Sequence, residues 1–140
     1  FIQVNGDNVF RSGLVRRLLD APEAAVTVAI NHKPAYDADD MKVMLDGARL
    51  TEIGKTLPLE AVDAEAIGFY VFRGPGPRAY AETLDHAMRD AAALKQWFPS
   101  AIGALAKRLP VMTVAMDGVE WCEVDVPSDL THARHLVAGW

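Results

Sequence analysis

The sequence predicts an α/β layer fold with a mixed sheet. Short β-branched apolar runs, which are typical of strands, alternate along the chain with segments whose apolar residues recur at helical spacing. Two Asp-Gly pairs, Asp46-Gly47 and Asp117-Gly118, are each flanked by apolar runs, a pattern typical of β-hairpins. The alternation indicates strands joined by helices, and the hairpins add antiparallel strands to the sheet.

The first half of the chain is expected to contain one helix and a group of strands. Apolar residues at helical spacing predict a helix over 9–20, with Ser12 as its N-cap and Pro22 beyond its end. A polar loop over 31–40 separates a buried β-branched strand from the first hairpin. The strands predicted in this half cover residues 25–30, 41–45 and 48–53.

The second half is expected to hold the remaining helices and the second hairpin. A turn at Gly74-Pro75-Gly76-Pro77 separates a strand from a long helical pattern, and Pro127 fits the first position of a final helix. The expected strands cover 66–72, 111–115 and 119–122, and the helices before the last hairpin cover 78–94 and 100–109.

The composition is that of one globular domain covering residues 1–140. The chain has 140 residues, of which 51% are hydrophobic and 24% charged. A net charge of −5 disfavours a nucleic-acid-binding surface, and no apolar run approaches the roughly 20 residues that span a bilayer. The single cysteine, Cys122, favours a reducing, cytoplasmic setting.

The chain opens inside an apolar strand pattern, Phe1-Ile2-Gln3-Val4, without a polar lead-in. We therefore expect an upstream segment, or a companion chain, to complete the domain.

Acidic segments near the two ends give the strongest indication of chemistry. Asp7 follows the apolar run 1–4, and Asp125 follows the segment 120–124 and precedes a predicted helix. In α/β sheets, ligands bind beyond the carboxyl ends of strands, and two carboxylates delivered there could hold one divalent metal together with phosphate. This predicts phosphoryl or nucleotidyl transfer. The alternatives are an Asx turn at Asp7 and helix capping by Asp125.

Other residues are candidates for binding a substrate. Lys42 and Lys55 lie on or beside the first hairpin, where an ammonium suits phosphate, although lysines of this kind often face solvent. Glu65, at the start of a strand, is a candidate acceptor of hydrogen bonds from a polar group. The aromatic residues that would form a cage for a quaternary ammonium, or alternatively pack in the core or at its rim, are Tyr36, Trp97 and Trp121.

Another interpretation is a glycosyltransferase metal site at Asp37-Ala38-Asp39. This segment matches the D-x-D metal motif of glycosyltransferases, but acidic positions crowd a surface loop here, and a solvated acidic turn is the structural alternative.

Several segments, in order, resemble the second half of the sugar-phosphate nucleotidyltransferase superfamily, and most closely the phosphocholine cytidylyltransferase type. Inositol-phosphate and aminoethylphosphonate cytidylyltransferases are related types. The likeness covers essentially the whole chain. The segments that carry it are Val4-Asn5-Gly6-Asp7, Asp39-Asp40-Met41-Lys42-Val43, Ile53-Gly54-Lys55-Thr56-Leu57, Glu65-Ala66-Ile67-Gly68-Phe69, Trp121-Cys122-Glu123-Val124-Asp125 and Pro127-Ser128-Asp129-Leu130.

The resemblance implies a Rossmann-like nucleotidyltransferase fold and dependence on Mg²⁺. It also implies transfer of a nucleoside monophosphate, expected to be CMP from CTP, to a small phosphorylated alcohol such as phosphocholine, with release of pyrophosphate. By position, the residues implied to act are Asp7 and Asp125 for the metal, Lys42 or Lys55 for the attacking phosphate, and Glu65, Tyr36 and Trp121 for the alcohol end.

The resemblance also implies that the fold is incomplete. The glycine-rich nucleotide loop of the family lies upstream of the aspartate strand, and the prolines of Gly74-Pro75-Gly76-Pro77 lack the N–H donors that such a loop supplies. The chain alone is therefore expected to have little or no activity. A non-catalytic binding or regulatory domain with the same fold is the rival expectation.

Overall fold

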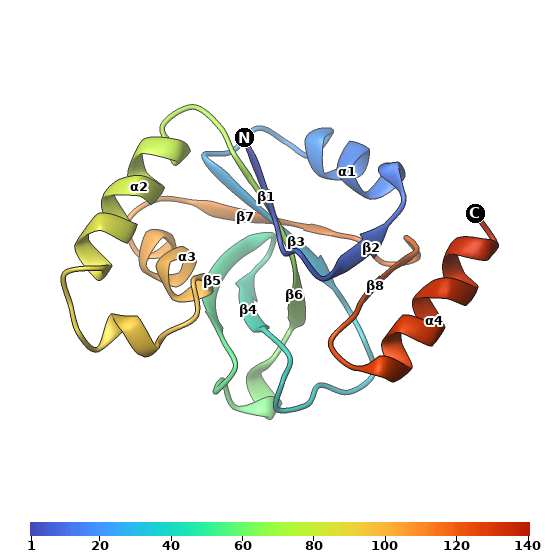
Figure 1. Cartoon of the computed structure of the whole chain (residues 1–140). Helices are drawn as coiled ribbons and strands as arrows, with labels where there is room; N and C mark the ends of the chain where they lie inside the picture. The colour runs from blue at the N-terminus through green and yellow to red at the C-terminus, as the bar shows by residue number, and fades with distance from the viewer.

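The computed structural model describes residues 1–140, apart from the side chain of residue 94, and confirms an α/β fold with a mixed sheet. The strands of the main sheet are β1 (Ile2–Val4), β3 (Val26–Asn31), β4 (Lys42–Asp46), β5 (Arg49–Gly54), β6 (Ala64–Phe72) and β7 (Val111–Ala115). Their order is β1-β6-β3-β7-β5-β4, and β4 also pairs with β6, so the sheet curls back on itself (Figure 1). Strands β3 and β7 run parallel, and the other pairs are antiparallel.

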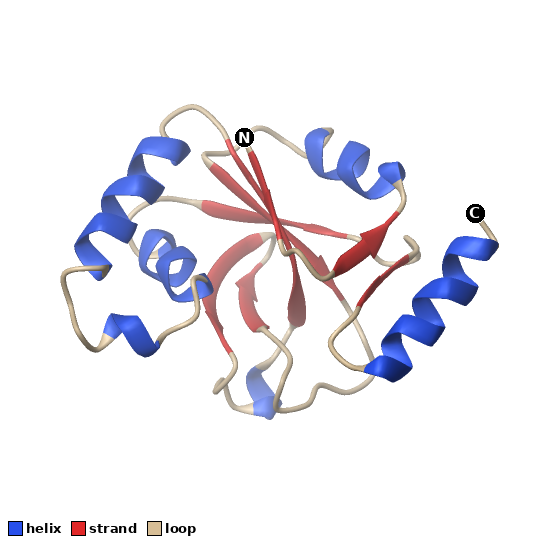
Figure 2. Cartoon of the chain, viewed as in Figure 1, coloured by secondary structure: helices blue, strands red, loops and turns tan.

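Helices cover both faces of this sheet, as Figure 2 shows. The helices are α1 (Ser12–Leu19), α2 (Gly76–Ala87), α3 (Pro99–Ala106) and α4 (Pro127–Ala138), and short 3-10 turns are η1 (Leu59–Ala61) and η2 (Ala93–Lys95). Leu14 and Leu18 of α1 pack on one face, and Tyr80 of α2 packs with Ile102 and Leu105 of α3 on the other. None of the described helices is long and apolar enough to cross a membrane.

Strand β6 lies between these two cores, which explains its continuous apolar sequence. Tyr70 and Phe72 belong to the core under α2 and α3, whereas Phe69 and Val71 belong to the core under α1. A strand that is buried on both faces has no polar face to alternate with the apolar one. The sequence over 66–72 therefore predicted the strand correctly.

The hairpin predicted around Asp46-Gly47 is confirmed. Strands β4 and β5 pair with Asp46 opposite Arg49, and Gly47 adopts φ 59°, a left-handed conformation that glycine adopts without a steric cost.

The second predicted hairpin is wrong. Strand β7 pairs with β3 and β5 in the main sheet, whereas β8 (Trp121–Glu123) pairs with β2 (Asn8–Phe10) in a separate two-stranded sheet. Gly118 still turns the chain, with φ 75°, but the turn carries it from one sheet to the other. Local turn chemistry specifies a change of direction and leaves the pairing partner to tertiary contacts.

The predicted helix over 9–20 begins later than expected. Residues 8–10 form β2, because Val9 pairs with Cys122 and the Phe10 ring packs edge-on against Phe69 at 4.7 Å. The helix starts at Ser12, whose side chain makes no capping hydrogen bond, and Arg11 takes the N-cap position. Long-range pairing with β8 therefore overrides the local helical pattern.

The two middle helices are shorter than predicted. Helix α2 ends at Ala87, after which the N–H of Asp90 donates to the carbonyl of Ala87 at 2.9 Å, a 3-10 contact. The helix begins at Gly76 rather than at 78, and Gly76 lies against Ala25, just before β3. A Cβ at this position would stand 1.9 Å from the carbonyl oxygen of Ala25.

Candidate active site

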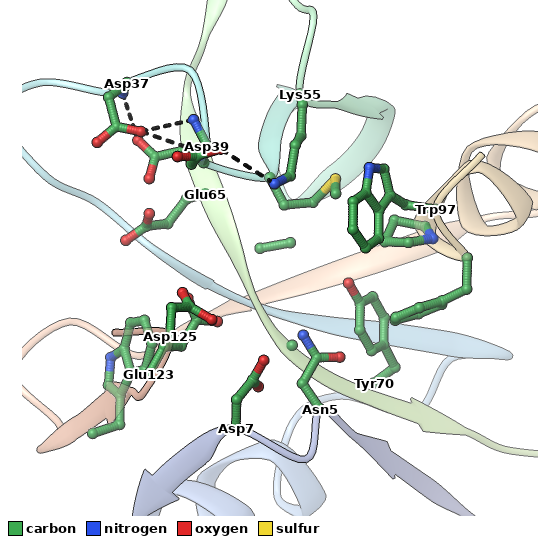
Figure 3. Close-up of a pocket in the computed structure, with 17 residues that line it drawn as sticks. Asn5, Asp7, Asp37, Asp39, Lys55, Glu65, Tyr70, Trp97, Glu123 and Asp125 are labelled. Atoms are coloured by element: carbon green, nitrogen blue, oxygen red, sulfur yellow. Dashed lines mark hydrogen bonds and ion pairs between the residues drawn. The ribbon is translucent and has the colours of Figure 1, made fainter. Parts of the chain in front are cut away.

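A cavity of about 560 Å³ opens where segments from both ends of the chain meet (Figure 3). Its walls come from the β1–β2 loop, the loop before β4, the end of β5, strand β6, the segment before α3, and β8 with the residues after it. Acidic side chains dominate the lining, and the one lysine among the lining residues is Lys55. The acidic residues are Asp7, Asp37, Asp39, Asp40, Glu65, Glu123 and Asp125.

The structure brings Asp7 and Asp125 together. The antiparallel pairing of β2 with β8 aligns the two segments, and the N–H of Val124 donates to the carbonyl of Asp7 at 3.0 Å. Both carboxylates line the cavity and point into the same part of it (Figure 3). A metal held by both residues requires that their carboxylates come together in this way. The pairing of β2 with β8 brings them together, and the sequence did not predict that pairing.

Helix capping does not occupy the Asp125 carboxylate. Asp129, the third residue of α4, accepts hydrogen bonds from the N–H groups of Val126 and Asp125 at 2.9 and 3.1 Å. A carboxylate in the first turn also suits the helix dipole. Asp129, and not Asp125, therefore caps the start of α4.

Glu123 lines the cavity together with Asp7 and Asp125, and its pKa is shifted. Burial raises the pKa of Glu123 to about 7, and the negative charges of Asp7 and Asp125 act in the same direction. Two like charges beside a half-buried carboxyl disfavour its ionised form. Burial is thus the main cause of the raised pKa of Glu123, and the two neighbouring aspartates add to it.

This donor set fits Mg²⁺. Within residues 1–140 as described, no three His, Cys, Asp or Glu side chains gather as a metal site. Mg²⁺, however, is usually held by one or two carboxylates together with water and substrate phosphates. Asp7 and Asp125 supply such a pair, and both line the cavity.

Lys55 and Trp97 form another wall of the cavity. The Nζ atom of Lys55 lies 5.1 Å from the centre of the Trp97 ring and 3.7 Å from Oδ1 of Asp39. The Asp39 side chain is 99% exposed, so water screens this ion pair strongly. The ammonium is therefore held loosely and is accessible to an anionic ligand.

Glu65, which lines the cavity, is held in place by a network of polar side chains. Asn31 donates to its Oε1 at 3.1 Å, and Lys33 contacts its Oε2 at 2.9 Å and Oδ1 of Asp40 at 2.6 Å. Burial raises the pKa of Asp40, but its hydrogen bonds from Lys33 and from the N–H of Asp37 outweigh burial and lower it below the usual 3.8. Burial likewise lowers the pKa of Lys33, and its contacts with Asp40 and Glu65 reverse the shift, so this pKa is raised.

We expect Lys33→Met to cost about 1–3 kcal/mol of folding stability at pH 7, because it leaves two largely buried carboxylates without their cation. Since the folded pKa of Asp40 is lowered, its contribution is present above pH 4 and is lost as the pH falls through the folded value. Urea unfolding of both proteins between pH 7 and pH 3 should therefore show the difference shrinking in acid. A difference that stays constant would contradict this assignment.

Two of the residues selected from the sequence lie outside the cavity lining. Lys42 is buried, and its Nζ atom donates to the carbonyl of Lys55 at 2.7 Å. Tyr36 braces its own loop: its hydroxyl donates to the carbonyl of Asp63 at 3.1 Å, and its ring faces the ammonium of Lys33 at 5.8 Å. Trp97 and Trp121 do line the cavity, so the three aromatic residues do not form a single cage.

The segment Asp37-Ala38-Asp39 is an acidic turn. Oδ1 of Asp37 accepts hydrogen bonds from the N–H groups of Asp39 and Asp40 at 2.9 and 3.3 Å. This is the Asx-turn arrangement, in which the carboxylate bonds its own backbone. Both aspartates line the cavity, but Asp37 is already engaged in shaping the loop.

Sequence reasoning missed Tyr70 as a cavity residue. Ala66, Gly68 and Tyr70 alternate along β6 and all line the cavity, so the period of a strand was the available signal. Burial raises the pKa of Tyr70, which keeps its hydroxyl protonated, and Figure 3 shows this hydroxyl pointing toward Trp97.

Comparisons with known proteins agree with this fold. No protein-family model matches the sequence. Over 143 aligned residues the chain is 28% identical to the bifunctional IPC transferase and DIPP synthase of Rubrobacter xylanophilus; the match covers all of this chain and 30% of that protein.

Solved structures of similar shape include two nucleotidyltransferases. The inositol-1-phosphate CTP transferase from T. maritima matches with a TM-score of 0.73 and 15% identity, over 98% of this chain and 54% of that one. The CTP:phosphocholine cytidylyltransferase from Streptococcus pneumoniae matches with a TM-score of 0.67 and 15% identity, over 97% and 57%. The chain spans about half the length of these structures and has the nucleotidyltransferase fold.

Proposed function

We propose that this chain supplies the acceptor side and the metal-binding carboxylates of a nucleotidyltransferase. The reaction moves CMP from CTP to a small phosphorylated alcohol such as phosphocholine and releases pyrophosphate. The observation that carries the proposal is the convergence of Asp7 and Asp125 on a cavity that also presents Lys55. Because the chain covers about half of the related structures, we assign nucleotide binding to the half it does not cover, in the same chain or in a companion chain.

The negative and positive side chains of the cavity would have different roles. Asp7 and Asp125 would hold Mg²⁺, which when bound offsets the negative charge of the triphosphate. Lys55 would hold the phosphate of the acceptor. An oxygen of that phosphate forms the new bond to the α-phosphorus while the bond to pyrophosphate breaks. This oxygen is anionic at neutral pH, so no proton has to be removed from it. The protein has to position the two substrates and neutralise the charge of their phosphates.

The lining favours an acceptor that carries a positive charge. Seven acidic side chains and one lysine line the cavity, and the exposed ring of Trp97 adds aromatic surface. Carboxylates and aromatic faces together attract a quaternary ammonium. Phosphocholine has this cation and a phosphate for Lys55. An inositol phosphate, the acceptor named in the T. maritima protein, has the phosphate without the cation and is the natural competitor.

We expect Trp97→Leu to weaken phosphocholine binding by about two- to thirtyfold, because the cation loses an aromatic face. Binding of inositol 1-phosphate should weaken less, because it loses only what Trp97 contributes through its contact with Lys55. Isothermal titration of both compounds into the chain measures this, and Trp140→Leu is the matched control, because Trp140 packs over Arg11 at 5.6 Å, away from the cavity. Equal losses for both compounds would contradict a cationic acceptor.

A non-catalytic binding domain is the second candidate. Within the described residues, no glycine-rich loop presents N–H groups to the cavity. Gly74 and Gly76 lie at the start of α2, and the N–H of Gly76 donates to the carbonyl of Arg73 at 2.8 Å. The test is pyrophosphate release from CTP with phosphocholine and Mg²⁺, once the nucleotide-binding half is supplied. Acceptor binding without release would favour the second candidate.

A further inference from the structure

Lys42 is a buried lysine that the proposed chemistry does not use. It begins β4 and pairs with Gly54 of β5 on one side and with Glu65 of β6 on the other. The residue is only 2% exposed. Removing an ammonium from water is costly unless it is well hydrogen-bonded, so its partners show what it does in the fold.

The partners of Lys42 are backbone carbonyls of two segments that line the cavity. Its Nζ atom donates to the carbonyl of Lys55 at 2.7 Å and, more weakly, to that of Asp40 at 3.4 Å. Its own N–H also donates to the carbonyl of Asp40 at 3.0 Å. The buried ammonium therefore ties the acidic loop before β4 to the end of β5.

Little else in the cavity fixes Lys55. Its ammonium faces the Trp97 ring and an exposed carboxylate of Asp39, and both contacts permit movement. Figure 3 shows the Lys55 side chain extending from the end of its strand into the cavity. Where its ammonium lies is thus decided mainly by the backbone from which the side chain starts.

We infer that Lys42 is a positioning residue, whose buried ammonium fixes the backbone from which Lys55 reaches the phosphate of the acceptor. The inference rests on the proposed function, because it takes Lys55 as the phosphate ligand. It replaces the sequence expectation that Lys42 itself binds phosphate, since Lys42 is not among the residues that line the cavity.

A double-mutant cycle tests this assignment. Lys42→Met keeps the length of the side chain and removes its charge and donors, and it is combined with Lys55→Met. Phosphocholine affinity is measured by calorimetry on the chain, and the melting temperature is recorded for each protein. We expect Lys42→Met alone to weaken binding by roughly three- to thirtyfold and to have no further effect in the Lys55→Met background.

Other results separate the inference from the proposed function. If Lys55→Met weakens binding but Lys42→Met only lowers the melting temperature, or weakens binding equally in both backgrounds, Lys42 does not act through Lys55. If Lys55→Met leaves binding unchanged, Lys55 is not the phosphate ligand, and both the inference and that part of the function fail. Should Lys42→Met not fold, Lys42→Arg, which keeps the charge but displaces the donors, is placed in the same cycle with the same criteria.

Discussion

Replacing Asp7 or Asp125 with Asn is expected to lower turnover by roughly ten- to a thousandfold, which corresponds to about 1.4–4 kcal/mol in the barrier. Asn keeps the size of the side chain and removes its charge, and both positions face the same part of the cavity. Positioning and charge neutralisation supply most of the catalysis in phosphoryl transfer, so the loss should fall on kcat. The measurement is pyrophosphate release from CTP, with phosphocholine and Mg²⁺, by this chain together with the nucleotide-binding half.

Asp46→Asn is the matched control for these variants. Asp46 lies exposed at the β4–β5 turn, away from the cavity, and loses the same charge without an expected change in rate. Turnover at the wild-type rate in Asp7→Asn and Asp125→Asn would remove the metal role proposed for them. A loss confined to Asp37→Asn and Asp39→Asn would instead assign the metal to the Asp37-Ala38-Asp39 turn.

The double variant Asp7→Asn/Asp125→Asn gives a further criterion. Two ligands of one cation act as a unit, so the second substitution should cost much less than it does alone. Two carboxylates with separate roles would show losses that multiply. Both carboxylates line one cavity, and the hydrogen bond from the N–H of Val124 to the carbonyl of Asp7 holds their segments side by side.

The sequence was informative where a local pattern decides the structure. Three predictions are confirmed: the apolar strand that is β6, the turn at Asp46-Gly47 and the start of α4 at Pro127. Each depends on residues that are near neighbours in the chain. Asp7 and Asp125 also follow extended segments and line the cavity, and their role as metal ligands stays a prediction. Their charge and their place in the chain sufficed to select them.

Other features depend on partners that are distant in sequence. Val9 and Phe10 carry a helical pattern, yet they form β2 because β8 offers them an edge. Lys42 gives no local sign that it is buried, since its burial follows from having β5 and β6 on either side. Tertiary pairing outweighs the few tenths of a kcal/mol that separate local propensities.

Gly68 links the fold of β6 to the cavity. It has φ 79° in the middle of the strand, where the pairing of β3 with β6 shifts register between Val28 and Ile30. A Cβ added there would stand 2.7 Å from Cγ of Asn5 and 2.9 Å from Nδ2 of Asn8. A glycine at such an irregularity admits a close neighbour, and here that neighbour is the β1–β2 loop that carries Asp7.

Gly68→Ala is therefore expected to lower the free energy of unfolding by about 2–4 kcal/mol, from strain at positive φ and from the clash with Asn5. This should appear as a melting temperature lower by about 5–15 °C and as slower turnover, because the clash displaces the segment that holds Asp7. Gly13→Ala is the matched control: it lies in α1, nothing stands within 4 Å of its added Cβ, and it should gain up to about 1 kcal/mol. If the two variants melt alike, the Asn5 side chain moves aside without cost, and the packing of the β1–β2 loop against β6 does not fix the position of Asp7.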